Sequence, residues 1–314
     1  MTLLPYGTVR ISNPREHETM TLPAFDPARP IAIIGCGVMG AKVAWTCARK
    51  GIPTRAYDTS AEQLERSLAL IKGWSEGEER KTLGTNLTST RDLDEALAGA
   101  QLAFENVPEV MDLKQRIHAD IGRRLAADAY MGSNTSSMLC TPLAEASGRP
   151  QRFFNMNFTD PRHQGLVEIM GGSKTAPETI AFALAWAQAI GMVPLLTRKE
   201  IMGYSFNRLW RAIKKEVLHQ VDKGYAAPED IDRAWMLTFG TPYGPFGLMD
   251  QIGLPTILKI EETYHAASGE ESDRPPAMLK AMIADGRTGL ASGRGFYSYP
   301  DPAFEKPSFL KGTG

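Results

Sequence analysis

The segment that runs from Ile31 to Lys50 constrains the fold of this chain more than any other part of its sequence. It opens with a short apolar run, Ile31-Ala-Ile-Ile34, of the kind that forms a buried parallel strand. The spacing Gly35-x-Gly37-x-x-Gly40 comes directly after it, and an alanine-rich amphipathic stretch then predicts a helix. Because the N-terminus of such a helix offers unpaired N–H groups and the positive end of a dipole, this order of elements predicts a seat for the phosphates of a dinucleotide.

The three glycines of this motif serve different purposes. Gly35 permits the tight turn, Gly37 lets the backbone approach a pyrophosphate, and Gly40 lets the helix pack closely against the strand. Val38 and Met39 lie between them at the predicted start of the helix, so all five residues are candidates for cofactor binding. Three glycines in a loop can also form a turn without binding a ligand. The strand and the acidic residue that come after the helix favour the dinucleotide-binding interpretation.

A second predicted strand, residues 53–57, ends at Asp58, where a carboxylate can bind the hydroxyl groups of an adenosine ribose. Asp58 would repel a 2'-phosphate, and Thr59 and Ser60 add no positive charge beside it. The sequence therefore favours NAD over NADP as cofactor, although Arg55 points weakly in the other direction. Asp58 has a second interpretation as the N-cap of the next helix, and it could do both.

The composition excludes several classes of protein. The 314 residues, 43% of them hydrophobic, suffice for two domains and a sizeable core, and a formal net charge of -1 gives no basic surface for nucleic acid. No apolar stretch reaches the length of a membrane span, and no signal-peptide pattern is visible. Cys36, Cys47 and Cys140 are odd in number and lack the spacing of a metal site. We therefore expect a cytoplasmic protein with reduced cysteines and no metal.

Strands and helices alternate as far as residue 200, which predicts one parallel sheet with an antiparallel edge. Beyond that point apolar residues recur at helical spacing, and residues 203–223 are predicted to form a long helix. We expect an extended N-terminal arm over residues 1–29, an α/β Rossmann dinucleotide-binding domain over residues 30–200, and a smaller all-α domain over residues 201–314.

Two segments of the first domain have features of their own. Residues 59–82 are predicted to form a helix that ends in a charged, exposed turn. The strand predicted from Tyr130 ends in the polar cluster Ser133-Asn-Thr-Ser-Ser137. In a doubly wound sheet such a cluster lies at the edge where ligands bind. The same residues could instead form a turn that caps a helix at Met138.

Taken together, seven motifs resemble those of the L-3-hydroxyacyl-CoA dehydrogenase family, in the same order along the chain. The resemblance covers residues 30 to 300 approximately. It implies an NAD-dependent dehydrogenase that acts on a hydroxyl group and forms a homodimer through its helical domain. The motifs are Gly35 to Gly40, Glu105-Asn-Val-Pro-Glu109 with Lys114, Ser133-Asn-Thr-Ser-Ser137, Leu166-Val-Glu168, Gly203-Tyr-x-x-Asn207-Arg208, Gly244-Pro-Phe-Gly-Leu-Met-Asp250 and Gly293-Arg-Gly-Phe-Tyr297.

The resemblance also implies roles for single residues. Glu109 and Lys114 match positions near the nicotinamide ribose, and Asn134 joins them as a cofactor-binding candidate. Ser136 matches the serine that contacts the substrate hydroxyl or carbonyl, and Asn207 matches the active-site asparagine. Glu168 matches the acid that orients the catalytic histidine.

The sequence departs from the family at the general base. In the family this base is the histidine of Arg-Phe-x-Gly-x-His-Phe-Phe-Asn-Pro, and the matching run here, residues 152–161, has Asn157 in its place and Asp160 in place of the asparagine. Asn157 can hydrogen-bond a substrate oxygen but cannot accept a proton near neutral pH. His163 is a candidate replacement that could pair with Glu168 or Asp160. It could equally be an exposed loop histidine.

The segment between Asp58 and residue 88 departs from the family as well. The family usually has a longer and often lysine-rich helical hairpin there, which helps to hold coenzyme A, whereas this segment is short and holds three glutamates within residues 76–79. A clamp for a polyanion should be longer and more basic. We therefore favour a small free β-hydroxy acid, or a related alcohol or aldehyde, as substrate. Arg211, one turn beyond Asn207, is the candidate partner for a substrate carboxylate and is assigned with Ser136 and Asn207 to substrate binding.

Three functions stay open at this point. The first is an NAD-dependent dehydrogenase of a small β-hydroxy acid or related alcohol with changed machinery for proton transfer. The second is a short-chain L-3-hydroxyacyl-CoA dehydrogenase in which Asn157 is tolerated. The third is a non-catalytic NAD-binding protein of the same fold, because Ser136, Glu168 and Asn207 each also have a packing or capping explanation.

Overall fold

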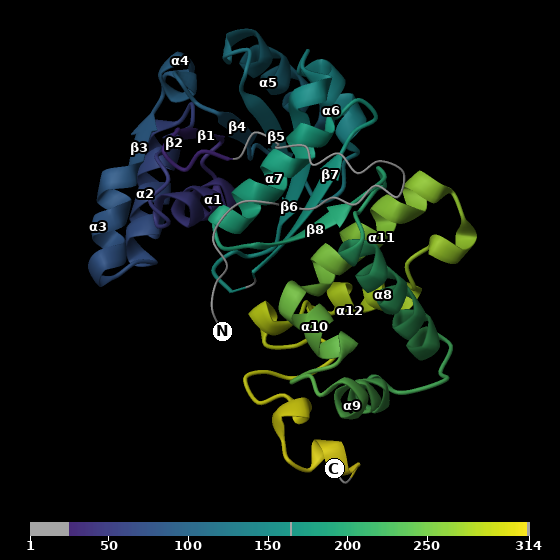
Figure 1. Cartoon of the computed structure of the whole chain (residues 1–314). Coiled ribbons are helices and arrows are strands. Elements are labelled where there is room, and N and C mark those ends of the chain that lie inside the picture. The colour runs from purple at the N-terminus through teal and green to yellow at the C-terminus, as the bar shows by residue number, and fades with distance from the viewer. Residues whose placement is uncertain (1–24, 164, 313–314) are drawn as a thin grey trace, which may run out of the picture. The chain divides into compact units, whose positions relative to one another are not determined.

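The computed structural model describes residues 25–163 and 165–312 (Figure 1). Most of the predicted N-terminal arm, residues 1–24, lies outside the described residues. The chain divides into two compact units, one that ends at Asn207 and one that begins at Arg208. Each unit has a hydrophobic core of its own, and each is described by itself.

The first unit is built on an eight-stranded sheet with the order β3-β2-β1-β4-β5-β6-β7-β8. Neighbouring strands from β3 to β6 are parallel, β7 runs antiparallel to β6, and β8 is parallel to β7. This confirms the predicted parallel sheet with an antiparallel edge. The strands are β1 (Ile31–Ile34), β2 (Thr54–Tyr57), β3 (Leu87–Thr90), β4 (Leu102–Glu105), β5 (Tyr130–Asn134), β6 (Phe153–Phe158), β7 (Leu166–Gly171) and β8 (Val193–Thr197).

Helices cover both faces of this sheet because its central strands are apolar on both sides. In β1, Ile31 and Ile33 belong to a core shared with α1 and α7, whereas Ala32 and Ile34 belong to a core shared with α4, α5 and α6. Figure 1 shows α7 and α5 on opposite sides of the strands. The helices are α1 (Val38–Ala48), α2 (Ala61–Gly73), α3 (Gly77–Asn86), α4 (Leu93–Leu97), α5 (Met111–Arg124), α6 (Cys140–Ala146) and α7 (Pro177–Ala189).

The strand order reverses between β1 and β4, which are neighbours in the sheet although β2 and β3 lie between them in the sequence. The connections that leave the carboxyl ends of these two strands therefore diverge to opposite sides. In open α/β sheets ligands bind in the crevice at such a reversal. The order β3-β2-β1-β4-β5-β6 thus places a binding site above the carboxyl ends of β1 and β4.

The charged segment after α2 is not a turn, as the sequence predicted, but the helix α3. Only one residue of this helix, Leu83, is buried, so the sequence has no apolar period that would reveal it. The N-cap of α2 is Ser60, whose hydroxyl accepts a hydrogen bond from the Gln63 N–H. The alternative interpretation of Asp58 as this N-cap is therefore wrong.

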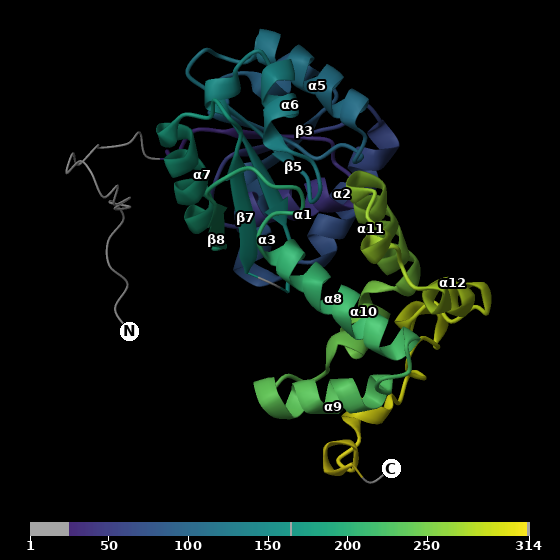
Figure 2. The same cartoon turned by 90° about the vertical axis from the view of Figure 1, so that its right-hand side faces the viewer.

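The second unit is helical. α9 packs on α10, α10 on α11, and α11 on α12 (Figure 2). No helix in the described ranges is long and apolar enough to cross a membrane. The sequence pattern predicted an elbow over residues 240–247 before a helix at residues 248–252, but this helix, α10, begins at Pro245. The bounds are α8 (Phe206–Asp222), α9 (Pro228–Phe239), α10 (Pro245–Ile252), α11 (Leu254–Ser268) and α12 (Ala277–Ala284).

Gly295, of the last sequence motif, and Gly289, shortly before that motif, make room for the buried residue Asp250. Asp250, fully buried on α10, accepts hydrogen bonds at 2.9 Å from the N–H groups of Phe296 and Tyr297. A Cβ added at Gly295 would lie 2.0 Å from Oδ1 of Asp250, and one added at Gly289 would lie 2.4 Å from its carbonyl oxygen. These glycines therefore serve packing within the helical unit.

Candidate active site

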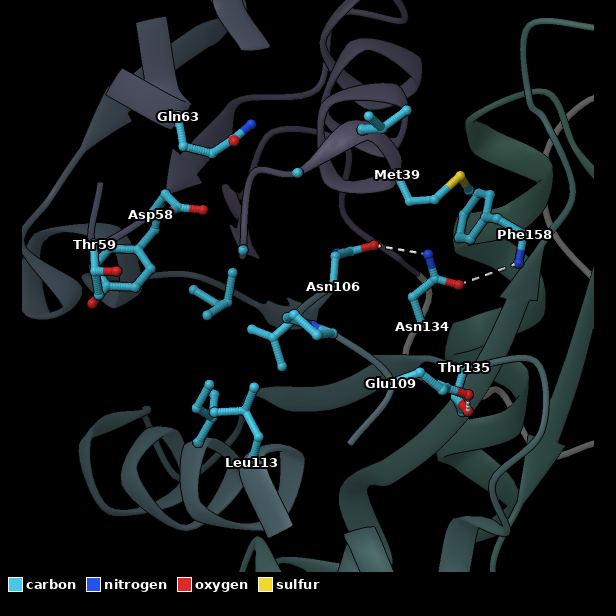
Figure 3. A pocket seen from close by; sticks show the side chains of 18 of the residues that line it. Met39, Asp58, Thr59, Gln63, Asn106, Glu109, Leu113, Asn134, Thr135 and Phe158 are labelled. Atoms are coloured by element: carbon cyan, nitrogen blue, oxygen red, sulfur yellow. Dashed lines mark hydrogen bonds between the residues drawn. The ribbon is translucent and has the colours of Figure 1, made fainter. Parts of the chain in front are cut away.

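A cleft of about 980 Å³ lies at the carboxyl ends of β1, β4 and β5, within the first unit (Figure 3). This is the place that the strand reversal predicts. Of the residues assigned to the site from the sequence, those that line this cleft are Gly35, Gly37, Val38, Met39, Asp58, Glu109, Asn134, Ser136 and Asn157.

The glycine loop has the geometry that phosphate binding requires. Gly35 has a φ of +88°, and a Cβ there would lie 3.0 Å from the backbone of Asn106. A Cβ added at Gly40 would lie 1.9 Å from the Gly35 carbonyl oxygen, whereas one at Gly37 meets nothing within 4 Å. Gly35 and Gly40 are thus needed for the turn and its packing, and Gly37 leaves open space for a ligand. No side chain caps α1 at Gly37, so the N–H groups of its first turn remain available to an anion.

Asp58 is fixed at the other side of this loop. Its two carboxylate oxygens accept hydrogen bonds from the Cys36 N–H at 2.9 Å and the Ser60 N–H at 3.0 Å. Each oxygen keeps a second lone pair, so the carboxylate can still accept from the hydroxyl groups of a ribose. Arg55, the residue that pointed weakly to NADP, donates instead to the carbonyl oxygens that end α4.

A chain of amide contacts joins three neighbouring strands at the cleft. The Asn134 Nδ2 donates to Asn106 Oδ1 at 2.9 Å, and the Phe158 N–H donates to Asn134 Oδ1 at 3.4 Å, as the dashed lines in Figure 3 show. Asn106 was not singled out from the sequence. Its position directly after β4, within the motif Glu105–Glu109, was the available signal.

The polar cluster after β5 is organised around Glu109. One oxygen of this carboxylate, Oε1, accepts hydrogen bonds from the Thr135 hydroxyl, from the Ser136 N–H at 3.2 Å and from the Ser137 hydroxyl at 2.9 Å. α6 begins at Cys140, so the cluster does not cap a helix at Met138, as its second interpretation held. The cluster instead orients a carboxylate toward the cleft.

Lys114 lies behind the cleft rather than in its lining. Its side chain is fully buried, and its ammonium contacts both oxygens of the buried Glu105, at 2.8 and 3.1 Å, and the Asn134 carbonyl oxygen at 2.9 Å. Glu105 also accepts from Ser133 and contacts the His118 ring at 3.0 Å. Burial opposes ionisation of Glu105, but His118 and Lys114 outweigh it and lower its pKa. Sequence reasoning missed Glu105 and His118, which look like ordinary strand and helix positions.

Asn157 and Glu168 face each other across the antiparallel pair β6 and β7. The Asn157 Nδ2 donates to Glu168 Oε2 at 3.3 Å, and both side chains are nearly inaccessible to solvent. The other oxygen, Oε1, accepts from the N–H groups of Ser205 at 3.0 Å and Phe206 at 2.7 Å, where α8 begins. Glu168 thus positions both the Asn157 amide and the helix start that carries Asn207, which itself does not line the cleft.

His163 is exposed and does not line the cleft. The two acceptors proposed for it are engaged by other groups: Glu168 as described, and Asp160 by Lys42 at 2.7 Å and by Arg162 at 3.1 Å. Although burial opposes ionisation of Asp160, these hydrogen bonds hold its pKa well below the usual range. The structure therefore gives His163 the surroundings of an exposed loop histidine.

Arg211 already has anionic partners within the second unit. Its guanidinium lies 3.4 Å from Glu261 and 2.9 Å from Asp273, and it stacks over the ring of Tyr264. A substrate carboxylate would have to compete with these two carboxylates for the same group.

Comparisons with known proteins agree with this geometry. The family model of the 3-hydroxyacyl-CoA dehydrogenase NAD binding domain matches residues 30–201, and the model of the 3-hydroxyacyl-CoA dehydrogenase C-terminal domain matches residues 203–299. The chain belongs to the 3-hydroxyacyl-CoA dehydrogenase family. The expected fold, a Rossmann domain followed by a helical domain, is that of this family, and so are NAD as cofactor and dehydrogenase activity on a hydroxyl group.

Members of this family with different names resemble the chain to similar degrees. It is 31% identical over 286 residues to 5-formyl-3-hydroxy-2-methylpyridine 4-carboxylate 5-dehydrogenase of Mesorhizobium japonicum. This alignment covers 86% of this chain and 91% of the relative. It is 33% identical over 277 residues to a probable 3-hydroxybutyryl-CoA dehydrogenase of Deinococcus radiodurans, in an alignment that covers 85% of this chain and 99% of the relative. The crystal structure of (S)-3-hydroxybutyryl-CoA dehydrogenase from Ralstonia eutropha matches with a TM-score of 0.79 at 29% identity over 87% of this chain and 100% of that one.

Proposed function

We propose that this dehydrogenase oxidises the hydroxyl group of a small free β-hydroxy acid, or of a related alcohol or aldehyde hydrate, with NAD as the acceptor. The observation that carries the proposal is the nucleotide cleft, with its open glycine loop and fixed Asp58, which ends at the amide of Asn157 and at Ser136. The similarity to a relative named for a free pyridine carboxylate supports a substrate without coenzyme A.

The charges of α3 support the same substrate class. Lys81 pairs with Glu78 at 2.6 Å, and Glu79 pairs with Arg49 of α1 at 3.2 Å. Arg80 donates to a backbone carbonyl, that of Lys72. The basic side chains of this helix are thus matched by carboxylates or a carbonyl, and a polyanion such as coenzyme A would find little net positive charge there.

In this proposal the polar groups at the end of the cleft hold the substrate oxygen. Bound NAD supplies the site that accepts the hydride. Ser136 donates to the oxygen that becomes the carbonyl, and Asn157, held by Glu168, fixes its direction. Asn207 enters through the start of α8, which the same Glu168 caps. His163 has no part in this arrangement.

The test is a panel of substrates assayed for NADH formation. The panel contains free β-hydroxy acids, aromatic alcohols and aldehydes, carnitine-like hydroxy amines and short 3-hydroxyacyl-CoA thioesters. We expect turnover with a free small molecule and at least about 100-fold lower kcat/KM with every thioester, because α3 offers no clamp. Turnover confined to the thioesters would contradict the proposal.

The second candidate is a short-chain L-3-hydroxyacyl-CoA dehydrogenase in which Asn157 is tolerated. It is favoured by the match of both family domains and by the similarity to a probable 3-hydroxybutyryl-CoA dehydrogenase. Oxidation of 3-hydroxybutyryl-CoA in the same panel would select it.

We also propose that two copies of the chain associate through the helical unit, as the resemblance implies. That unit exposes large apolar side chains, which an interface would cover. A molar mass of one chain by light scattering at all concentrations would contradict this. The exposed residues include Leu209, Tyr225, Leu237 and Phe239.

A further inference from the structure

The proposed function requires a group that takes the hydroxyl proton, and the cleft holds few titratable side chains. Among its described lining residues the charged ones are Asp58, Asp120 and Glu109. Asp120 pairs with Arg123 and Arg124 at 3.0 and 3.1 Å on the surface of α5. None of the lining side chains is cationic.

The two remaining carboxylates lie at opposite ends of the cleft. Figure 3 shows Asp58 and Thr59 on one side and Glu109 beside Thr135 on the other. With the adenosine half of a dinucleotide at Asp58 and its phosphates at the glycine loop, the nicotinamide half extends toward Glu109. Glu109 is therefore the titratable side chain at the reacting end.

One oxygen of Glu109 remains available at this end. Oε1 is occupied by the three donors of residues 135–137. Among the described residues, Oε2 has only the Lys114 ammonium, at 3.5 Å. About a third of the side chain is exposed, 37%, so a proton that reaches Oε2 can leave to water.

The ammonium of Lys114 is shared between Glu109 and a second, closer carboxylate. Lys114 lies closer to Glu105, at 2.8 Å, and both of those side chains are fully buried. Because the buried Glu105 already balances the charge of Lys114, Glu109 is not half of an isolated ion pair. Its carboxylate can take up a proton without leaving Lys114 as an uncompensated buried charge.

We propose that Glu109 is the general base of the reaction. The hydroxyl proton of the substrate passes to Oε2 of Glu109, and the electrons of the O–H bond form the carbonyl double bond. The carbon that bears the hydroxyl group releases its hydrogen, with the electrons of the C–H bond, as the hydride that NAD would accept. This assignment rests on the proposed function. It gives the proton a destination that the Asn157 amide cannot offer and that the exposed His163 is not placed to offer.

The first experiment compares the wild type with Glu109→Gln on the substrate found in the panel. We expect kcat to fall by about 10²–10⁴-fold, the range that a positioned base supplies. The Glu109→Ala variant should regain turnover when formate is added as an external base. Glu62→Gln, which removes an exposed carboxylate of α2, is the matched control and should keep wild-type turnover. Turnover within a few fold of wild type in Glu109→Gln, or its loss in His163→Ala, would overturn the assignment.

The second experiment does not depend on the substrate. A carboxylate next to the nicotinamide favours the positively charged oxidised ring over the neutral reduced one. Calorimetry should therefore show that Glu109→Gln lowers the ratio of NAD to NADH affinity by about tenfold, with Glu62→Gln unchanged. If Glu109→Gln leaves the ratio of NAD to NADH affinity unchanged, the assignment of Glu109 as the base is wrong, whatever the result of the substrate panel. If the wild type binds NAD but turns over no substrate of the panel, the proposed function is contradicted instead.

Discussion

At the scale of single residues, the contact between Asn157 and Glu168 places an amide beside a carboxylate on two neighbouring strands. The amide donates to Glu168 without bringing a second charge into a site where both residues are nearly inaccessible. An amide is therefore compatible with the buried carboxylate, but a carboxyl group would not be.

This contact gives a prediction for Asn157→Asp. Two carboxylates about 3 Å apart cannot both ionise freely, so the pKa of the introduced carboxyl is raised in the folded state above its unfolded value. The variant is then most stable at a pH below the pKa that the introduced carboxyl has in the unfolded state. Its stability falls as the pH rises through the higher pKa that this carboxyl has in the folded state. We expect a deficit in the free energy of unfolding of about 2–4 kcal/mol at neutral pH that shrinks toward pH 4.

The measurement is urea denaturation of the variant and the wild type across this pH range. Asn157→Leu, of similar size and without charge, is the control, and its deficit should not vary with pH in this way. An Asn157→Asp deficit that is constant with pH would mean that Glu168 does not sense the new charge.

At the scale of elements, the buried pair of Glu105 and Lys114 joins β4, α5 and β5. Lys114 projects from α5 to Glu105 at the end of β4 and to the carbonyl oxygen of Asn134 in β5. Removal of one partner from such a pair leaves an uncompensated buried charge, which costs far more than the loss of an exposed pair.

We therefore expect Lys114→Met to lower the free energy of unfolding by about 3–5 kcal/mol at neutral pH. Because His118 and Lys114 lower the pKa of Glu105 against the effect of burial, the stability from this pair is present above the unfolded pKa of the carboxyl and is lost as the pH falls. The difference between variant and wild type should accordingly shrink in acid. Lys81→Met, which breaks the exposed pair with Glu78, is the control in the same urea titrations. Equal losses in the two variants would contradict the prediction.

Local patterns predicted the elements whose burial is periodic or continuous, and missed those whose contacts come from elsewhere. β1 and the glycine turn were predicted correctly because an apolar run and three spaced glycines specify them. α3 was missed because only Leu83 is buried. α8 begins three residues later than predicted, because Tyr204 has a φ of 55° and Glu168 caps the helix from a distant strand.

The candidate site shows the same division. Asp58 and the glycines are predictable from spacing alone, whereas the burial of Lys114 depends on a carboxylate nine residues earlier in the chain. The occupied state of Asp160 depends on Lys42, from a different element. Pairings across such distances leave no periodic trace in a single sequence, so the sequence alone could not show that Asp160 and Glu168 already have other partners.

At the scale of the whole molecule, the chain consists of two units with separate cores, and every residue that lines the nucleotide cleft belongs to the first. The helix that continues into the second unit starts on Glu168, and the ring of Tyr204 is buried in a core of the first unit. The described residues that line the cleft therefore all precede Arg208.

We predict that residues 1–207, expressed alone, bind NAD with a Kd within about threefold of that of the full chain. Calorimetry on the fragment and on the full chain measures this directly, and Asp58→Ala in both is the control for binding at the cleft. A fragment that is folded by circular dichroism and yet fails to bind NAD would show that the second unit completes the site.

No side chain caps the first turn of α1, and this bears on how dissolved salt affects cofactor binding. Since no cationic side chain lines the described cleft, a pyrophosphate bound there would be held by the peptide dipoles of this turn at short range. Small inorganic anions such as sulfate can occupy the same kind of backbone seat and compete with a pyrophosphate for it. How firmly the cofactor is held therefore depends on the shape of the loop and not on a reserve of surface charge.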